Sequence, residues 1–212
     1  MRGLFLAQIS SSDEQVMWRV QMHDDATAFA ELSQRWRGRI QALCTRMMGD
    51  PHRGEDMAQE TFLRLYHKRK DYEPTGKFST WLWRVAINIC HDELRRTKRR
   101  NETSIDEQRG EGSSPVEPES LSDNQPDSTM EMAEEANLVR QALMQLPEMY
   151  RTVLVLRHYE GLKFREIAEV LGIPEGTVKS RMSEALTQFA SCYRQTRSRP
   201  PLTVILDQPR SL

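Results

Sequence analysis

The segment from Phe164 to Phe189 constrains the fold most, because its apolar residues repeat at helical spacing on both sides of a short turn. In the part after the turn, one face of the expected helix is apolar: Val178, Met182, Ala185, Leu186 and Phe189. The opposite face is polar: Lys179, Ser180, Ser183, Glu184 and Thr187. This arrangement predicts an amphipathic helix with an exposed polar surface.

The part before the turn predicts a shorter helix. Ile167, Ala168 and Leu171 form its apolar stripe, and Gly172 gives the backbone the freedom to leave the helix. Thr177 is the predicted N-cap of the second helix. A short helix that holds a polar helix at an angle is the helix-turn-helix motif, whose second helix enters the DNA major groove. The alternative is an ordinary antiparallel helix pair in a bundle.

Charge is strongly segregated along the chain. Residues 101–135 contain eleven acidic residues and one arginine, a net charge of −10, so the remainder of a chain with net charge −1 carries +9. The same segment is rich in Gly, Pro and Ser and shows no helical or alternating pattern until Met130. It predicts a disordered, acidic linker between two basic domains. A solubilising spacer and a mimic of nucleic acid in a partner's basic groove are both open readings of that linker.

The composition excludes several classes of protein. No apolar run approaches the ~18 residues that span a bilayer, and the first residues are too weakly apolar for a secretory signal. Three distant cysteines predict reduced thiols and a cytoplasmic location. The five histidines are scattered, and no nucleotide-binding or metal-binding motif occurs, so we expect no cofactor, no metal, no small-molecule substrate and no enzymatic activity.

Residues 24–100 show a succession of helical patterns. Apolar residues at three- and four-residue spacing predict one helix over residues 25–48, interrupted at Gly49. The next predicted helix, residues 55–70, has an acidic outer face with one exposed apolar residue: Asp56, Gln59, Glu60 and Leu63. Such a face is usually only solvated, but the leucine among acids favours a docking surface for a basic partner.

A third helix is predicted after the turn at residues 72–77, with Ser79 as its N-cap. Leu82, Val85, Ala86 and Ile89 form its core stripe, and the remaining face displays Trp83, Arg84, Ile87, His91 and Arg95, with Asn88 at its border. The helix ends in a basic cluster that includes Arg95, Arg96, Arg99 and Arg100. Rings that stack on bases, an amide that reads a base edge and arginines that neutralise phosphates are the requirements of a single-stranded DNA site. Core tryptophans beside a solvated basic helix end are the alternative.

The order and the residue patterns of three stretches resemble those of one protein family. Residues 55–66 (EDMAQETFLRLY), 78–96 (FSTWLWRVAINICHDELRR) and 146–181 (LPEMYRTVLVLRHYEGLKFREIAEVLGIPEGTVKSR) are similar to the extracytoplasmic-function sigma factors of bacteria. Such proteins contain only sigma regions 2 and 4, joined by a variable linker. The resemblance covers about residues 25–100 and 136–193.

The resemblance implies specific roles. Asp56, Gln59 and Glu60 match the family surface that binds clamp helices of core RNA polymerase, and Leu63 lies beside them. Residues 72–88 match the element that recognises the −10 promoter sequence, where Tyr72 and Asn88 stand at the positions of a pocket for a flipped base. In region 4, the −35 element would be contacted by Thr177, Lys179, Ser180, Arg181, Ser183 and Glu184. The resemblance also implies an anti-sigma factor as a partner.

One residue departs from the family. Where its members commonly carry Arg in the third turn of the recognition helix, this chain has Glu184. A carboxylate repels phosphate but accepts a hydrogen bond from cytosine N4, so the preferred −35 sequence is expected to differ.

Together these patterns predict an all-α protein of two small helical domains joined by a flexible acidic linker. The predicted divisions are an N-terminal extension (1–23), sigma region 2 (24–100), the linker (101–135), sigma region 4 (136–194) and a tail (195–212). The predicted function is to bind core RNA polymerase, direct it to promoters through −35 and −10 contacts, and promote melting. A regulator that binds duplex DNA alone, and an adaptor that binds polymerase without supporting transcription, are the alternatives.

Overall fold

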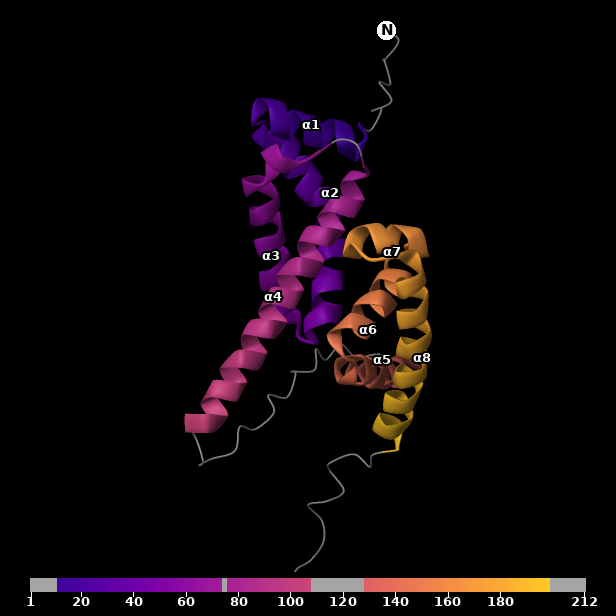
Figure 1. Ribbon diagram of the computed structural model, residues 1–212. Helices are drawn as coiled ribbons and strands as arrows, with labels where there is room; N and C mark the ends of the chain where they lie inside the picture. Colours follow the sequence, from indigo (N-terminus) through magenta and orange to yellow (C-terminus); the bar gives the residue numbers. More distant parts are fainter. Residues whose placement is uncertain (1–10, 74–75, 108–127, 199–212) are drawn as a thin grey trace, which may run out of the picture.

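The computed structural model describes residues 11–73, 76–107 and 128–198, and helices are the regular secondary structure of these ranges. A first bundle comprises α1 (Asp13–His23), α2 (Ala26–Met48), α3 (Pro51–His67), the short helix η1 (Arg69–Asp71) and α4 (Phe78–Glu107). A second comprises α5 (Ser128–Gln145), α6 (Glu148–Leu154), η2 (Val155–Tyr159), α7 (Phe164–Leu171) and α8 (Glu175–Arg197). Figure 1 shows the two bundles side by side. The prediction of an all-α protein is therefore confirmed.

The bounds of α2 follow from local chemistry. The Asp25 carboxylate accepts hydrogen bonds from the backbone N–H groups of Thr27 and Ala28, both at 3.0 Å, and satisfies donors that the first turn leaves unpaired. At the other end Gly49 adopts a φ of 76° and donates to the Thr45 carbonyl at 2.8 Å. The helix predicted over residues 25–48 is thus found as Ala26–Met48.

The N-terminal segment is more than an extension. Ser12 and Gln15 form a reciprocal capping box that starts α1. Val16, Met17 and Val20 on its inner face are fully buried. Asp13 accepts hydrogen bonds from the Trp36 indole and from Arg35 of α2, both at 2.9 Å. The prediction that the domain begins at residue 24 is wrong, because α1 supplies part of its core.

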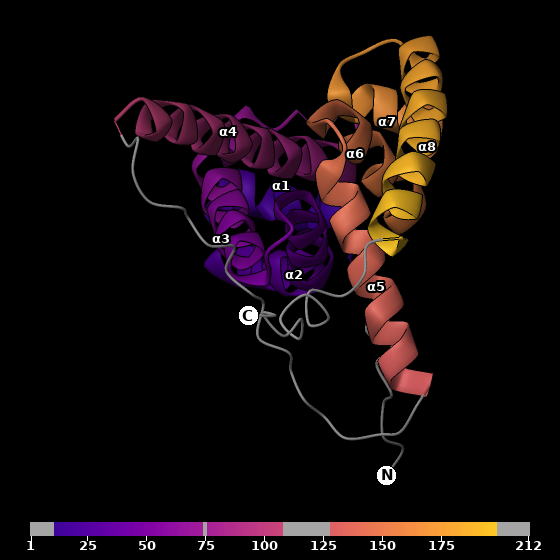
Figure 2. The same cartoon turned by 90° about the horizontal axis from the view of Figure 1, so that it is seen from below.

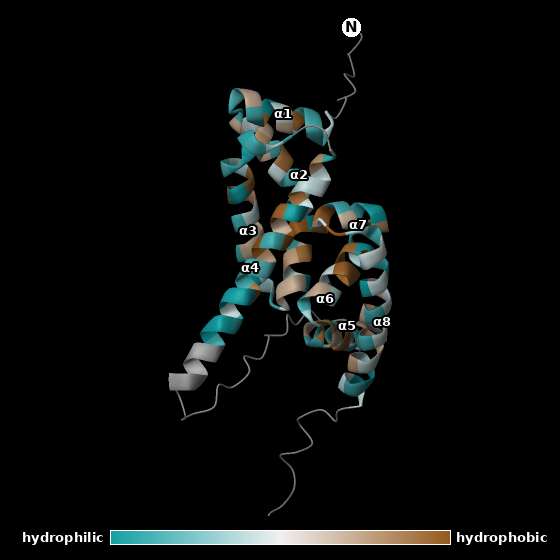
Figure 3. Cartoon of the chain, viewed as in Figure 1, coloured by the Kyte–Doolittle hydropathy of each residue, from teal (hydrophilic) through white to brown (hydrophobic). Residues whose placement is uncertain are grey.

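The core of the first bundle forms where α2, α3 and α4 meet, and it includes the fully buried side chains of Leu32, Ile40, Leu43, Leu65 and Leu82. Helix α4 begins at Phe78, so Ser79 lies in its first turn and is not the N-cap that we predicted. Its 30 residues make it about 45 Å long at 1.5 Å per residue. The part that runs clear of the other helices is mainly hydrophilic (Figure 3).

The second bundle contains the predicted helix-turn-helix. α7 ends at Gly172, whose φ of 65° lies in the left-handed region that glycine adopts without a steric penalty. Helix α8 starts at Glu175, with Pro174 as N-cap, and Thr177 donates its backbone N–H to the Pro174 carbonyl at 2.9 Å. The prediction of Thr177 as N-cap is wrong because the chain becomes helical directly after the proline, whose fixed φ suits a helix start.

The predicted linker bounds also need correction. Helix α4 continues to Glu107 and α5 begins at Ser128, so both ends of the 101–135 segment are helical. Likewise α8 continues to Arg197, three residues beyond the predicted end of region 4. Residues 108–127, which include much of the acidic linker, and residues 199–212 of the tail lie outside the described part of the chain, so the two readings of the linker stay predictions.

The two bundles contact each other directly. Helix α7 packs on α4, while α5, α6 and η2 pack on α2. Figure 2, seen from below, shows the second bundle along one side of the first, with α5 projecting beyond it. One predicted site residue, Arg84, makes polar contacts at this junction: its guanidinium donates to the backbone carbonyls of Val170 and Glu169 at the end of α7.

Candidate nucleic-acid and partner interfaces

The acidic outer face of α3 is solvent-facing, as predicted. Asp56, Gln59 and Leu63 are exposed, and 57% of Leu63 remains accessible. Glu60 is half-buried because it pairs with Arg64 one turn along, at 2.8 Å. A single exposed leucine is ordinary on a protein surface, so Leu63 bears on docking only together with the apolar groove beside it.

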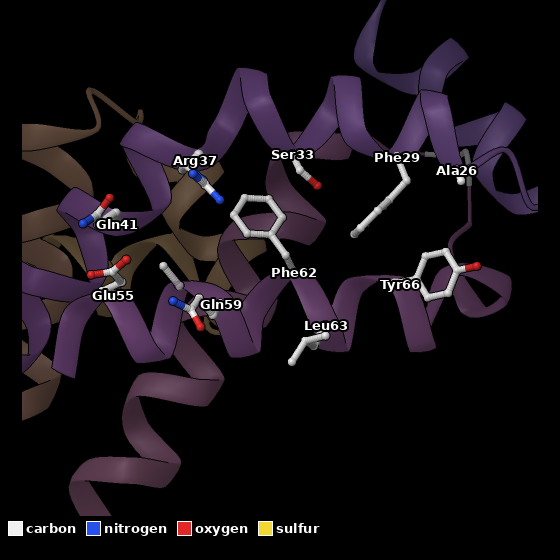
Figure 4. A pocket seen from close by; sticks show the side chains of 11 residues that line it. Ala26, Phe29, Ser33, Arg37, Gln41, Glu55, Gln59, Phe62, Leu63 and Tyr66 are labelled. Carbon is white, nitrogen blue, oxygen red and sulfur yellow. The ribbon is translucent and has the colours of Figure 1, made fainter. Parts of the chain in front are cut away.

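An apolar groove of about 570 Å³ runs beside this face, between α2 and α3. Phe62 points into the space between the two helices, with Phe29 and Tyr66 toward one end of the groove (Figure 4). Gln59 and Leu63 belong to the same lining, so two of the four predicted docking residues lie on the edge of the groove. Sequence periodicity did not reveal the groove, since it requires the packing of two helices.

The predicted −10 residues on α4 divide into two groups. Arg84 and Asn88 are exposed, as expected, whereas Trp83 is only 2% exposed and Ile87 is equally buried. The Trp83 ring meets Trp36 of α2 edge-to-face at 5.5 Å between centroids, and the Arg39 guanidinium lies 5.1 Å from its centre. The prediction that Trp83 is displayed is therefore wrong, because α2 covers that side of α4.

Tyr72 is also enclosed, with 3% of its surface accessible. Its ring lies 5.2 Å from Trp81 and 6.1 Å from Phe78, and its backbone carbonyl accepts a 2.7 Å hydrogen bond from Gln21 of α1. Burial raises the pKa of the Tyr72 phenol, which therefore stays neutral. A base that stacked here would have to displace or extend this aromatic cluster.

The basic end of α4 is exposed at Arg95, Arg96, Arg99 and Arg100. Arg95 pairs with Asp92 at 3.2 Å, and Arg96 pairs with Glu93 at the same distance. Exposed pairs of this kind contribute little energy and can be exchanged for phosphate contacts.

The polar face of α8 is mostly exposed, as predicted, at Lys179, Ser180, Ser183 and Glu184. Lys179 pairs with Glu175 at 2.7 Å, and Glu184 accepts a 2.8 Å hydrogen bond from Gln188. Thr177 and Arg181 are half-buried.

The junction brings the two predicted DNA-reading surfaces together. Asn88 of α4 and Arg181 of α8 line the same cavity of about 250 Å³. His91 and Thr152 belong to the same lining, and the His91 ring and the Thr152 hydroxyl are 2.9 Å apart. Burial lowers the pKa of His91, so the neutral ring is the form that makes this contact.

Several residues at the junction were not identified from the sequence. The buried Arg151 of α6 donates to four backbone carbonyls, one of them on α2. Glu160 of the second bundle lies between Arg39 and Arg46 of α2. For Arg151, the sequence offered one signal, an arginine within an apolar helical stretch. For Glu160 it offered none, because pairing with residues over 100 positions away leaves no local pattern.

The described ranges hold no group of three or more His, Cys, Asp and Glu side chains that could bind a metal ion. None of the helices in those ranges is long and apolar enough to cross a membrane. Cys44 and Cys90 are buried in the core, and contact with Cys44 together with burial raises the pKa of the Cys90 thiol. That thiol is therefore poorly reactive.

A four-helix bundle with a long basic helix, joined to a bundle with a helix-turn-helix, defines a sigma-70-type transcription initiation factor. The family models agree in both position and order: Sigma-70 region 2 matches residues 32–100, and Sigma-70 region 4 matches residues 136–189.

Known relatives narrow the class. The chain is 36% identical to the ECF RNA polymerase sigma factor SigW of Bacillus subtilis over 158 residues, 74% of this chain and 84% of that protein. It is 35% identical to the RNA polymerase sigma-H factor of Pseudomonas aeruginosa over 178 residues, 82% of this chain and 89% of that protein. The chain belongs to the extracytoplasmic-function sigma factors, which direct RNA polymerase to promoters and are not enzymes.

Solved structures share the fold. CnrH in complex with the cytosolic domain of CnrY has a TM-score of 0.61 at 23% identity, covering 87% of this chain and 99% of that one. The sigma factor RpoE in complex with the anti-sigma factor NepR from Bartonella quintana has a TM-score of 0.60 at 19% identity, covering 80% and 98%.

Proposed function

We propose that the chain docks on core RNA polymerase through the outer face of α3. The exposed Leu63 beside Asp56 and Gln59, on the rim of an apolar groove, is the observation that carries this assignment. Acidic side chains attract a basic partner over the Debye length, and the apolar groove then supplies the burial that holds it.

We assign −10 recognition to the exposed face and basic end of α4. The Asn88 carboxamide can hydrogen-bond to a base edge, and the Arg84 guanidinium can pair with a phosphate. The arginines at 95, 96, 99 and 100 can neutralise further phosphates along the DNA backbone. Tyr72, enclosed beside Trp81, is the aromatic wall of a pocket that opens for an extruded base. The burial of Trp83 favours a supporting role for this residue, since it packs between α2 and α4.

We assign −35 recognition to the exposed face of α8. The Lys179 ammonium can donate hydrogen bonds to the acceptors of a guanine edge, and the Glu184 carboxylate can accept one from cytosine N4. The small side chains of Ser180 and Ser183 allow the helix to approach the floor of the major groove closely. Arg181 lies at the flank of this face and can hydrogen-bond to a DNA phosphate. Thr177, at the start of the helix, can make the same kind of contact.

The regulatory partner is proposed from the neighbours alone. RpoE of Bartonella quintana was solved with an anti-sigma factor, and we infer that this chain is also held by one. A cytoplasmic location follows from the family, because its members act on RNA polymerase.

Docking is tested by pull-down with core polymerase. Asp56→Arg together with Glu60→Arg is expected to weaken core binding at least tenfold, because it reverses both charges on the docking face. Asp71→Arg with Glu134→Arg is the matched control, since it changes net charge equally at exposed positions away from that face. Unchanged binding of the first variant, with a native circular dichroism spectrum, contradicts the docking assignment.

Transcription with core polymerase on a promoter library separates the alternatives. A sigma factor supports specific transcription and needs the core enzyme for a specific footprint. A duplex-binding regulator would footprint its operator alone, and an adaptor would bind polymerase without supporting transcription.

A further inference from the structure

One face of α1 reaches residues on which the proposed −10 pocket depends. Glu14 and Gln21 are seven residues apart, so they lie two turns apart on the same side of the helix, about 10 Å along its axis. Helix α1 packs on η1 and on α4, and Figure 1 shows it across the end of the bundle at which α4 begins. Tyr72 follows η1 directly and Phe78 is the first residue of α4, so a single helix is placed to hold both.

Gln21 holds the chain on the side of η1. Its side-chain amide donates to the backbone carbonyl of Tyr72 at 2.7 Å and to that of Lys70 at 3.2 Å. The amide nitrogen carries two hydrogens, so both bonds can form at once. Asp24, directly after α1, adds an ion pair with Arg69 of η1 at 2.5 Å. The backbone that carries the Tyr72 ring is therefore fixed to α1.

Glu14 holds the start of α4. Its carboxylate accepts a 3.1 Å hydrogen bond from the backbone N–H of Phe78. The first turn of a helix leaves its N–H groups without acceptors inside the helix, and the helix dipole favours a negative charge there. The residue before Phe78 is Lys77, whose side chain has donors only and cannot cap the helix. The acceptor therefore comes from a residue 64 positions earlier in the chain.

Helix α1 is itself fixed to the body of the first bundle. Asp13 accepts 2.9 Å hydrogen bonds from Arg35 and Trp36 of α2. Met17, between Glu14 and Gln21 on the same face, is fully buried. Burial raises the pKa of Glu14, but hydrogen bonds from backbone N–H groups outweigh it and lower the pKa below its ordinary value, so the carboxylate stays charged.

The side chains held in this way form the aromatic cluster of Tyr72, Phe78 and Trp81. The Tyr72 ring lies 5.2 Å from Trp81 and 6.1 Å from Phe78, and the Phe78 and Trp81 rings are 6.3 Å apart. Rings interact with one another and with a base only within a narrow range of distances and angles. A cluster that is ordered before the base arrives loses less conformational freedom on binding.

We propose that α1 preorganises the −10 pocket: Glu14 and Gln21 are positioning residues that hold the aromatic cluster in the arrangement that receives an extruded base. This inference rests on the proposed function, because it concerns the pocket assigned there to Tyr72. Both residues act through the backbone of Tyr72 and Phe78 and not through contact with DNA. The N-terminal helix thus contributes to promoter melting as well as to the core.

The expected size follows from the cost of order. Without the two contacts, the aromatic cluster is ordered only when the base binds, and ordering two or three side chains weakens binding by about tenfold. Core polymerase binding does not involve this cluster. Loss of Glu14 or Gln21 is therefore expected to separate promoter melting from core binding.

Hydrogen exchange of the Phe78 amide in the full-length chain tests the geometry. In the wild type this amide is protected, because it donates to Glu14. Glu14→Ala is expected to raise its exchange rate at least tenfold, whereas Glu14→Gln keeps an acceptor oxygen and most of the protection. Equally slow exchange in folded Glu14→Ala overturns the contact.

Open-complex formation by the holoenzyme tests the positioning role. On a promoter that the wild-type holoenzyme melts, Glu14→Ala and Gln21→Met are expected to reduce permanganate reactivity of the −10 region about tenfold at equal binding of core polymerase. Glu14→Gln keeps the acceptor and Gln21→Lys keeps a donor, so both should recover most of the reactivity. Val16→Ala is the matched control, because it removes a fully buried side chain of the same helix and leaves both contacts in place.

Tyr72→Ala separates this inference from the proposed function. If Tyr72→Ala melts the promoter as well as the wild type does, the pocket assignment fails and the role of α1 with it. If Tyr72→Ala is defective while folded Glu14→Ala and Gln21→Met equal the wild type, the positioning role is overturned and the pocket stands. If Val16→Ala is as defective as those two variants, or the conservative variants recover nothing, α1 acts through stability alone and the proposal is overturned.

Discussion

Arg151 offers the sharpest test of what holds the second bundle together. Arg151 is 7% exposed, and its guanidinium donates to the carbonyls of Leu143, Met144 and Leu146, at 3.0, 3.0 and 3.1 Å, around the C-terminal end of α5. A fourth bond, 2.6 Å long, reaches the Met47 carbonyl near the end of α2. One cation thus satisfies the terminal carbonyls of two helices, which lack partners inside their own helices.

The magnitude follows from those four bonds. Arg151→Met keeps much of the volume but leaves buried acceptors without their donor, at about 1–3 kcal/mol for each unsatisfied group. Burial of the guanidinium also costs several kcal/mol of desolvation in the native protein, and the Met variant is free of that cost. Burial lowers the pKa of Arg151, which agrees with that penalty. We therefore expect a net loss of about 3 kcal/mol, or on the order of 15 °C in melting temperature for a bundle of this size.

Two signals separate the bundles in the assay. All four tryptophans lie between residues 18 and 83, so their fluorescence follows the first bundle, whereas circular dichroism follows both. In urea, Arg151→Met should shift the circular dichroism transition far more than the fluorescence transition. Arg165→Met is the control, because that side chain is 81% exposed and pairs only across one helical turn. A change within about 0.5 kcal/mol of wild type for Arg151→Met would refute the reasoning.

Further outcomes are expected at the DNA-reading surfaces and at the junction. Asn88→Ala should reduce permanganate reactivity of the −10 region at least tenfold while core binding stays unchanged, since it acts on an extruded base. Equal melting would place the pocket elsewhere. In selections from randomised −35 sequences, Lys179→Ala should relax one position at a cost of about 1–3 kcal/mol, and Glu184→Arg should change the preferred base at one position. Selection of wild-type sequences by both variants would exclude α8 as the reader. Burial lowers the pKa of His91 in the folded protein, whereas in the unfolded chain this pKa keeps its ordinary value of about 6.5. As the pH falls below about 6.5, the unfolded chain therefore takes up the proton more readily, and the free energy of unfolding decreases. Urea titrations at pH 7.5 and 5.5 should therefore show a larger loss for wild type than for His91→Gln, and equal losses would contradict the neutral contact with Thr152.

Local patterns predicted the elements that have local causes. The start and end of α2 follow from Asp25 and Gly49, and the turn before α8 follows from Gly172 and Pro174. Helix α1 was missed because its apolar residues do not keep to one face: Val16, Met17 and Val20 are buried while Trp18 and Met22 are exposed.

Exposure was harder to predict than helicity. The side of α4 left over from its core stripe was expected to face solvent, but α2 covers Trp83, and the second bundle meets Arg84. Contacts between residues far apart in the sequence, such as Glu160 and Arg39 at 121 positions, depend on how whole bundles pack. A single sequence carries no periodic signal for such packing.

The position of α1 has a consequence for fragments of this protein. The family match to region 2 begins at residue 32, but three fully buried side chains, Val16, Met17 and Val20, lie before it. At about 1.5–3 kcal/mol for each buried side chain, their removal would withdraw roughly 5–9 kcal/mol, comparable to the 5–15 kcal/mol that stabilises a typical domain. A fragment cut at the family boundary should express as a loosely packed chain with exposed indole at Trp36, whereas one that starts before Ser12 retains the whole cooperative unit.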